Sequence, residues 1–397
     1  MTKQPSYRFM SYVEPWEEKK LSDGISKIGD GIHGTPVYSE DGDYYFINGN
    51  NLVDGKIFLF PETKKVQSNQ LTVSDTSLKK NTILMSINGT IGSLAWYRDE
   101  KVMLGKSVAY LTTEEFNKKF IYSILQTPKI VKHFNNNLTG TTIKNLGLKT
   151  IRDTVISLPS LPEQTAIGSY FQDIDQLISL QQRKLEVLKE QKKTYLKLLF
   201  PAKGQTKPAL RFAGFEDEWQ RQNFGDYLVE YNEKTVVENQ HELLSSTNNG
   251  IEPRVGRVSG ESNLGYKVLK KDMIVLSPQN LWLGNINYNS NYDLGIVSPS
   301  YKIFNIENVD KKFIATLIRH PYMNYEYGQA SVQGASVVRR NLDIDLFNGI
   351  QIFLPSLEEQ SLIGSFFQDL DKAIAKQEEK VNQLKESKQT LLRKMFI

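Results

Sequence analysis

The sequence contains no cysteine and only four histidines, so disulfide frameworks and thiolate metal sites are excluded. No apolar run approaches the roughly 18 residues of a membrane-spanning helix. The amino-terminal residues lack the apolar centre of a secretory signal, and we therefore expect a cytoplasmic protein. Positive charge is barely in excess, with 49 lysines and arginines against 45 aspartates and glutamates. At about 100–200 residues per domain, the 397 residues predict a multidomain protein.

A long internal repeat organises the chain. Residues 158–200 match residues 354–396 at an offset of 196 without a gap, and 23 of the 43 positions are identical. A second, shorter set of repeated residues lies at the start of each variable region, at an offset of 203. Its matching pairs are Pro5/Pro208, Arg8/Arg211, Phe9/Phe212 and Trp16/Trp219. The sequence therefore predicts two tandem units, each a variable region followed by a similar segment. A solenoid of short repeats would show three or more copies.

The repeated segments have the pattern of long helices. Ser160 with Glu163, and Ser356 with Glu359, fit capping boxes that would satisfy the first backbone amides. Apolar residues then recur in alternating steps of four and three, which is the spacing of a coiled-coil seam. The apolar seam positions are Ile167, Phe171, Ile174, Ile178, Leu185 and Leu188 in the first segment, and Ile363, Phe367, Leu370, Ile374, Leu384 and Leu391 in the second.

Polar residues interrupt both seams at matching positions, which are Gln181 and Lys192 in the first and Gln377 and Lys388 in the second. They either fix the register of the pairing or lie at a loose, hydrated edge. We expect the two helices to pair antiparallel, with Ile167 near Met395 and Leu188 near Ile374. Lys192 would then face Leu370 and Lys388 would face Ile174, so that no two lysines meet.

The variable regions show short apolar or alternating runs between turn residues, which predicts mixed α/β globules. Residues 44–47 and 56–60 are examples of expected strands. Asparagines gather in the expected loops, for instance at 48–51 and 285–287. Asparagine side chains can read adenine edges, but they are also ordinary turn formers.

Common catalytic motifs fail when their context is tested. Gly29, Gly31 and Gly34 match a dinucleotide pattern, but residues 35–38 do not open a helix after it. Gly105-Lys106-Ser107 resembles the end of a phosphate loop, yet Glu100 stands where a glycine is required. The histidines are widely separated, and the catalytic box of amino-methyltransferases is missing. We therefore expect no catalytic residues and no metal site in this chain.

Two variable globules, each followed by a similar long helix, resemble the specificity subunit of type I restriction-modification enzymes. The resemblance rests on the Leu-Pro-Ser-Leu-x-Glu-Gln segments at 158–164 and 354–360, on their helices, and on the Arg-Phe and Trp echoes at 8–16 and 211–219. Residues 31–38 also look like a segment common in target-recognition domains of that family. The second globule lacks this segment and looks like a different subtype.

The resemblance implies an α+β fold with two target-recognition globules and an antiparallel coiled coil, arranged as a pseudo-twofold tandem repeat. The expected division is a first recognition domain at 1–157, a central helical spacer at 158–204, a second recognition domain at 205–353 and a carboxy-terminal spacer at 354–397. Each globule would read one half of an asymmetric bipartite DNA site, and the helices would set the gap and dock the partners.

The same resemblance implies partners that carry the chemistry. Two modification subunits would bind S-adenosylmethionine and methylate a flipped adenine, and restriction subunits would use ATP and Mg²⁺. This chain itself would hold no cofactor. The residues expected to contact double-stranded DNA are Asn88, Thr90, Lys106, Ser107 and Lys144 in the first globule, and Gln279, Asn280, Gln333, Arg339 and Arg340 in the second.

Two other functions remain open at this point. The chain could be a non-catalytic adaptor that spaces two protein-binding globules on a coiled coil. It could also be an enzyme with an unfamiliar active site, which turnover by the purified chain alone would reveal.

Overall fold

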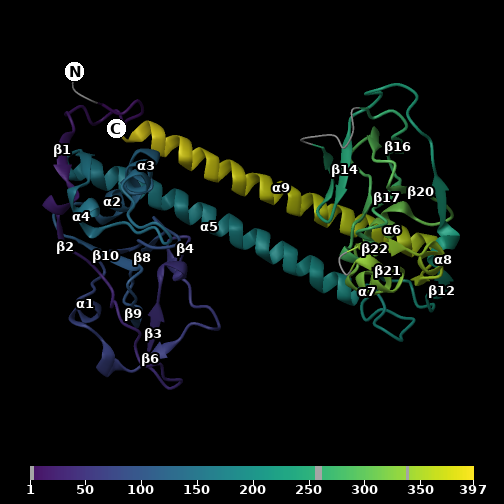
Figure 1. Ribbon diagram of the computed structural model, residues 1–397, viewed down its shortest axis with the longest axis horizontal. Helices are drawn as coiled ribbons and strands as arrows, with labels where there is room; N and C mark the ends of the chain where they lie inside the picture. The colour runs from purple at the N-terminus through teal and green to yellow at the C-terminus, as the bar shows by residue number, and fades with distance from the viewer. Residues whose placement is uncertain (1–3, 255–261, 337–338) are drawn as a thin grey trace. The chain divides into compact units, whose positions relative to one another are not determined.

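The structure is a computed structural model that describes residues 4–254, 262–336 and 339–397, with only the backbone described at 333–336 and 339. The chain divides into two compact units. The first contains residues 1–183 and 379–397, and the second contains residues 184–378. Both boundaries fall inside long helices, α5 (Leu161–Leu198) and α9 (Leu357–Met395), so each unit holds a globule and a portion of both helices (Figure 1).

The first globule is built on a four-stranded antiparallel sheet in the order β2-β10-β7-β8. Its strands are β2 (Ile25–Asp30), β10 (Val108–Thr113), β7 (Thr82–Ser86) and β8 (Leu94–Trp96). A three-stranded sheet adds β6 (Lys65–Val66), β3 (Tyr44–Ile47) and β9 (Val102–Leu104), and smaller pairs join β1 (Glu17–Lys20) to β11 (Val155–Leu158) and β4 (Leu52–Val53) to β5 (Lys56–Ile57). Its short helices are α1 (Val73–Thr76), α2 (Lys118–Ile124), α3 (Pro128–Asn136) and α4 (Leu148–Asp153).

The second globule repeats this core although its sequence differs. Its sheet has the order β13-β20-β17-β18, formed by β13 (Leu228–Tyr231), β20 (Lys302–Ile306), β17 (Ile274–Leu276) and β18 (Ile286–Tyr288). As in the first globule, a strand near the start of the globule pairs with the strand that precedes the long helix, here β12 (Gln220–Asn223) with β23 (Gln351–Leu354). Three short helices lie between β20 and β23 in the chain, as α2, α3 and α4 lie between β10 and β11 in the first globule: α6 (Lys311–Leu317), α7 (Pro321–Gln329) and α8 (Ile344–Asn348). Three pairs are its own, namely β14 (Leu244–Thr247) with β15 (Gly250–Pro253), β16 (Lys267–Lys270) with β19 (Leu294–Val297), and β21 (Ser331–Ser336) with β22 (Arg339–Leu342). The expected tandem α+β architecture is confirmed.

One expected strand is wrong in part. Residues 44–47 form β3 as predicted, but the strand expected at 56–60 ends after Ile57. Phe58 donates its backbone N–H to the carbonyl of Asn51 at 2.7 Å, and both Phe58 and Leu59 are more than one third exposed. Residues 58–60 have no regular secondary structure, and Phe58 packs on Phe60 at the surface instead of continuing a strand.

Antiparallel packing of the long helices is visible inside each unit. In the first unit, Ile167 and Phe171 of α5 share a buried cluster with Leu392 and Met395 of α9. In the second unit, Ile363 and Phe367 of α9 share a cluster with Leu199, just beyond the end of α5. The start of one helix therefore packs on the end of the other, and the expected antiparallel coiled coil is confirmed.

The seam lysines are paired with aspartates. Lys388 Nζ lies 2.5 Å from Asp175 Oδ1, and Lys192 Nζ lies 2.5 Å from Asp371 Oδ1. Each aspartate directly follows the apolar residue that the lysine was expected to face. The Lys388 side chain is only 12% exposed. Since a paired, shielded charge favours one alignment over its neighbours, the Lys388 pair favours register-fixing at that position. The Lys192 pair, with side chains 30% and 53% exposed, lies at a hydrated edge.

The capping-box expectation is wrong for the glutamates. Glu163 accepts two hydrogen bonds from Arg8, from Nε and Nη2, each at 2.7 Å. Glu359 accepts the equivalent pair from Arg211, at 2.9 and 2.6 Å. Both carboxylates are 1% exposed. At α9 only the serine half of the box is present, where the Glu359 backbone N–H donates to Ser356 Oγ at 3.3 Å.

The repeated glutamine also fastens each globule to its helix. Gln164 donates to the carbonyl of Pro159 at 2.9 Å and accepts the backbone N–H of Asn117, at the start of α2, at 3.0 Å. Gln360 makes the same two bonds, to Pro355 and from Asp310 at the start of α6. The repeated Glu-Gln pair is therefore an attachment point for the globule.

A cysteine crosslink tests the antiparallel register against a background free of native cysteine. Ile167→Cys combined with Met395→Cys should form a disulfide efficiently, because both side chains lie in one buried cluster. Ile167→Cys combined with Val381→Cys is the matched control. Val381 is 14 residues from Met395 along α9, roughly 21 Å at about 1.5 Å per residue. Equal crosslinking of the two pairs, measured on a non-reducing gel, would contradict the register.

Candidate nucleic-acid interface

Four loops of the first globule converge where β7 ends. Thr90 Oγ1 donates to the carbonyl of Gly49 at 3.0 Å, and Ser107 Oγ donates to Asn48 Oδ1 at 3.0 Å. The Gly49 backbone N–H in turn donates to Ser107 Oγ at 2.9 Å. Asn88 pairs with Asn145 as an isolated bridge, which adds the loop between α3 and α4. We call the loops at 48–51, 86–93, 105–107 and 139–146 the first loop cluster.

The first loop cluster contains all five residues expected to contact DNA in this globule. Lys106 and Lys144 are exposed, and among the described residues neither side chain has an ion-pair partner. Asn88 and Ser107 are half-buried and hold the loops together, since the Asn88 amide, with Nδ2 turned toward Asn145, donates to its Oδ1 at 2.7 Å. The lysines are thus free for phosphate, whereas Asn88 and Ser107 would have to exchange internal bonds to read a base.

The segment at 31–38 lies against this cluster. Gly31 N–H donates to the carbonyl of Val108 at 3.1 Å, and Ile32 N–H donates to that of Leu104 at 2.9 Å. A Cβ at Gly31 would lie 2.0 Å from the Leu104 carbonyl oxygen, so only glycine fits there. The segment therefore flanks the turn that carries Lys106 and Ser107, a proximity that the sequence did not reveal.

The second globule presents its expected residues at the equivalent place. Gln279 and Asn280 are exposed in the turn after β17, just before a short 3-10 helix, η5 (Leu281–Leu283). The Arg340 guanidinium lies over the Trp282 ring, 4.8 Å from its centroid. Backbone pairing aligns Arg340 with Gln333 across β21 and β22. The side chains of Gln333 and Arg339 lie outside the part that the structure describes.

Sequence reasoning missed two features of this second site. Trp282 supports Arg340, and Arg319 fastens the β14–β15 hairpin beside η5. Arg319 Nη2 donates to the carbonyl of Asn248 at 2.7 Å, while Nη1 donates to that of Gly284 at 3.3 Å. Arginine pairing and stacking depend on folded neighbours, so no sequence signal marked them. The asparagines at 285 and 287 are 6% and 5% exposed and bond to Ser246, so they are structural.

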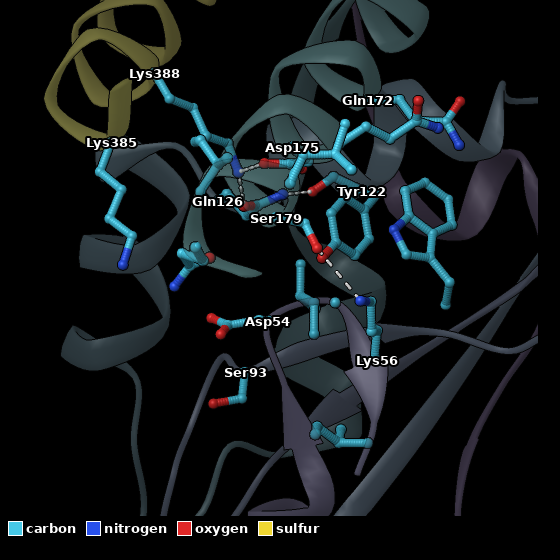
Figure 2. A pocket seen from close by; sticks show the side chains of 18 of the residues that line it. Asp54, Lys56, Ser93, Tyr122, Gln126, Gln172, Asp175, Ser179, Lys385 and Lys388 are labelled. Carbon is cyan, nitrogen blue, oxygen red and sulfur yellow. Dashed lines mark hydrogen bonds and ion pairs between the residues drawn. The ribbon is translucent and has the colours of Figure 1, made fainter. Parts of the chain in front are cut away.

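A cavity of about 770 Å³ in the first unit lies between the globule and the two helices (Figure 2). Lys388 Nζ reaches both Asp175 at 2.5 Å and Gln126 at 2.7 Å, and Lys56 Nζ donates to Ser179 Oγ at 3.3 Å. Burial raises the pKa of the Asp175 carboxyl even though Lys388 opposes this. The cavity therefore lies where polar contacts, among them the ion pair of Lys388 with Asp175, connect the globule to the two helices.

No cluster of possible metal ligands exists among the described residues. In the same residues, no helix combines the length and apolarity needed to cross a membrane.

Comparisons with known sequences match both units. The family model for the type I restriction modification DNA specificity domain covers residues 13–190 and 228–386. The chain is 24% identical to the specificity subunit of the type I restriction enzyme MjaVIII from Methanocaldococcus jannaschii, over 96% of this chain and 91% of that protein. It is 23% identical to the EcoBI specificity subunit from Escherichia coli over 70% of this chain, and the alignment spans 64% of that relative's length.

Solved structures agree on the fold. The crystal structure of a type I restriction-modification S subunit from M. genitalium matches with a TM-score of 0.65 at 17% identity, over 100% of this chain and 99% of that chain. A structure concerned with complex assembly and conformational transition of the type I system matches with a TM-score of 0.54 at 14% identity, over 97% and 98%. With the family model covering most of both units, the chain belongs to the specificity subunits of type I restriction-modification systems.

Proposed function

We propose that this chain is the non-catalytic DNA-reading component of a type I restriction-modification complex. The globule at 1–157 reads one half of a bipartite site and the globule at 205–353 reads the other. The segments at 158–204 and 354–397 act as spacers that fix the unread gap and dock two modification subunits. S-adenosylmethionine, ATP and Mg²⁺ would be bound by the modification and restriction subunits and not by this chain.

One observation carries this proposal. The two globules share a sheet order and a helix succession, yet the residues in the turn after the third core strand differ. That turn presents Asn88 and Thr90 in the first globule, and Gln279 and Asn280 in the second. A common scaffold with different polar groups at the same place suits two recognition globules that read different bases. The DNA site would then be asymmetric.

The spacer role follows from helix length and attachment. The 38 residues of α5 correspond to roughly 57 Å at about 1.5 Å per residue. Arg8, Arg211 and the repeated glutamines fix each globule to its helix through buried bonds. Rigid attachment of the reading heads would set the distance between half-sites, as it does in dimeric DNA readers. Lengthening both helices should lengthen the unread gap.

Arg340→Ala tests the second reading site in the assembled complex. Arg340 is half-buried, stacks on Trp282 and has no ion-pair partner among the described residues, so its loss should weaken binding of cognate DNA by about 1–3 kcal/mol. Binding to a duplex in which the second half-site is scrambled should change little. Lys271→Ala is the control, because Lys271 is an exposed cation of the same unit that pairs with Asp293 at 2.8 Å.

Competition binding at fixed salt reads out both variants. Unchanged cognate affinity for Arg340→Ala would remove this residue from the reading site. A complex that assembles with a modification subunit while methylation site choice ignores the recognition globules would favour the adaptor function instead. Turnover by the purified chain alone would contradict its non-catalytic role.

A further inference from the structure

The loop between α3 and α4 presents an apolar side chain at its tip. Thr139 and Asn145 exchange backbone hydrogen bonds, each 2.9 Å, which close the base of the loop. Ile143 at the tip is 70% exposed. Its neighbours at 141, 142 and 144 are exposed polar residues.

The loop is held rigidly enough to present this side chain. Gly140 has a φ of +86°, and a Cβ there would lie 2.3 Å from the Ile143 carbonyl oxygen, so the turn depends on glycine. Leu146 N–H donates to the carbonyl of Ile87 at 2.9 Å, which ties the loop to the turn after β7. A β-branched side chain adds its own stiffness at χ1. Ile143 is therefore a fixed apolar projection.

The position of Ile143 within the first loop cluster indicates what it contacts. Lys144 and Asn145 follow it directly, and Asn145 pairs with Asn88. Polar groups of the cluster can meet base donors, base acceptors or phosphate. Among the groups on the base edges in the major groove, the C5 methyl of thymine is the apolar one. An exposed isoleucine beside such polar groups is matched to that methyl.

We propose that Ile143 is a specificity-determining residue that contacts the methyl group of one thymine in the first half-site. This inference rests on the proposed reading function of the first globule. It assigns Ile143 an apolar contact in addition to the polar contacts expected from Thr90, Lys106 and Lys144. It also places the loop at 139–146 in the major groove.

Uracil substitution tests this contact, because uracil differs from thymine only by the missing methyl. The assembled complex with its modification subunits is bound to its cognate duplex, and each thymine of the first half-site is replaced in turn. One replacement should weaken binding about fourfold, the factor for burying one methyl-sized group. Ile143→Ala should weaken binding to thymine DNA similarly and should be indifferent to uracil at that same position.

Val13→Ala is the matched control, because Val13 is 76% exposed and belongs to the segment before Trp16, not to the four loops of the first loop cluster. It should keep the full uracil effect. A half-site without a uracil-sensitive thymine, or sensitivity that persists in Ile143→Ala, overturns the inference. Loss of the modification subunit from Ile143→Ala without DNA overturns it as well, because Ile143 would then bind protein. If the native complex ignores the whole first half-site, the proposed function itself fails.

Discussion

Glu163→Gln is expected to lower the free energy of unfolding of the first unit by about 3 kcal/mol, near the lower end of the range for breaking a buried ion pair. The Glu163 side chain is 1% exposed and the Arg8 side chain 10% exposed. Removing the carboxylate charge leaves the guanidinium shielded from water with a weaker partner. Trp16 Nε1 also lies 3.4 Å from Glu163 Oε1, so the change disturbs a second donor.

Hydrogen exchange of the slowest amides in β7 and α2 measures this loss. Asp153→Asn is the control in the same unit, because it breaks the exposed pair between Lys20 and Asp153, 3.0 Å apart. An exposed pair contributes less than about 1 kcal/mol. Glu359→Gln should reproduce the large loss in the second unit, through Arg211. Equal effects of Glu163→Gln and Asp153→Asn would show that the buried pair is not an attachment point.

Gly168→Ala and Gly364→Ala should each destabilise their unit by about 1–3 kcal/mol, the cost of overpacking a close contact. A Cβ at Gly168 would lie 2.6 Å from the backbone nitrogen of Phe120 in α2. A Cβ at Gly364 would lie 2.5 Å from that of Phe313 in α6. Backbone atoms cannot turn aside, so the short helix must move off the long one.

Gly328→Ala provides the control for these two substitutions. Gly328 lies inside α7, and a Cβ there would meet no atom within 4 Å. Alanine is the better helix former, so this change should stabilise the second unit by up to about 1 kcal/mol. The same change of glycine to alanine should therefore lower the stability at Gly168 and Gly364 and raise it at Gly328. Denaturant melts of each variant would read this out, and a stabilising effect at Gly168 would contradict the close helix contact.

The long helices and their pairing were predictable because their signals are local and periodic. The spacing of Ile167, Phe171 and Ile174 indicates a seam within eight consecutive residues, and the repeat supplies an independent second copy. The capping interpretation of Glu163 failed for the opposite reason. Its partner Arg8 is 155 residues away, and local spacing carries no information about such a contact.

The candidate site was predictable only as a set of polar loop residues. Asn88 and Thr90 follow β7, which places them near a sheet end. Which loops converge there depends on the three-dimensional path of the chain, so the approach of the segment at 31–38 was not foreseen. Stacking of Arg340 on Trp282 was also missed, because the two residues are brought together by a turn and a separate hairpin.

Exchange of one recognition globule tests whether each globule reads its own half of the DNA site. Residues 1–157 are replaced by the corresponding globule of another family member, and the methylated sites in a host carrying the hybrid and its modification subunit are mapped by methylome sequencing. One half-site should change while the other half-site and the gap between them remain. Methylated sites that stay the same in both halves, or that change in both halves, would contradict it.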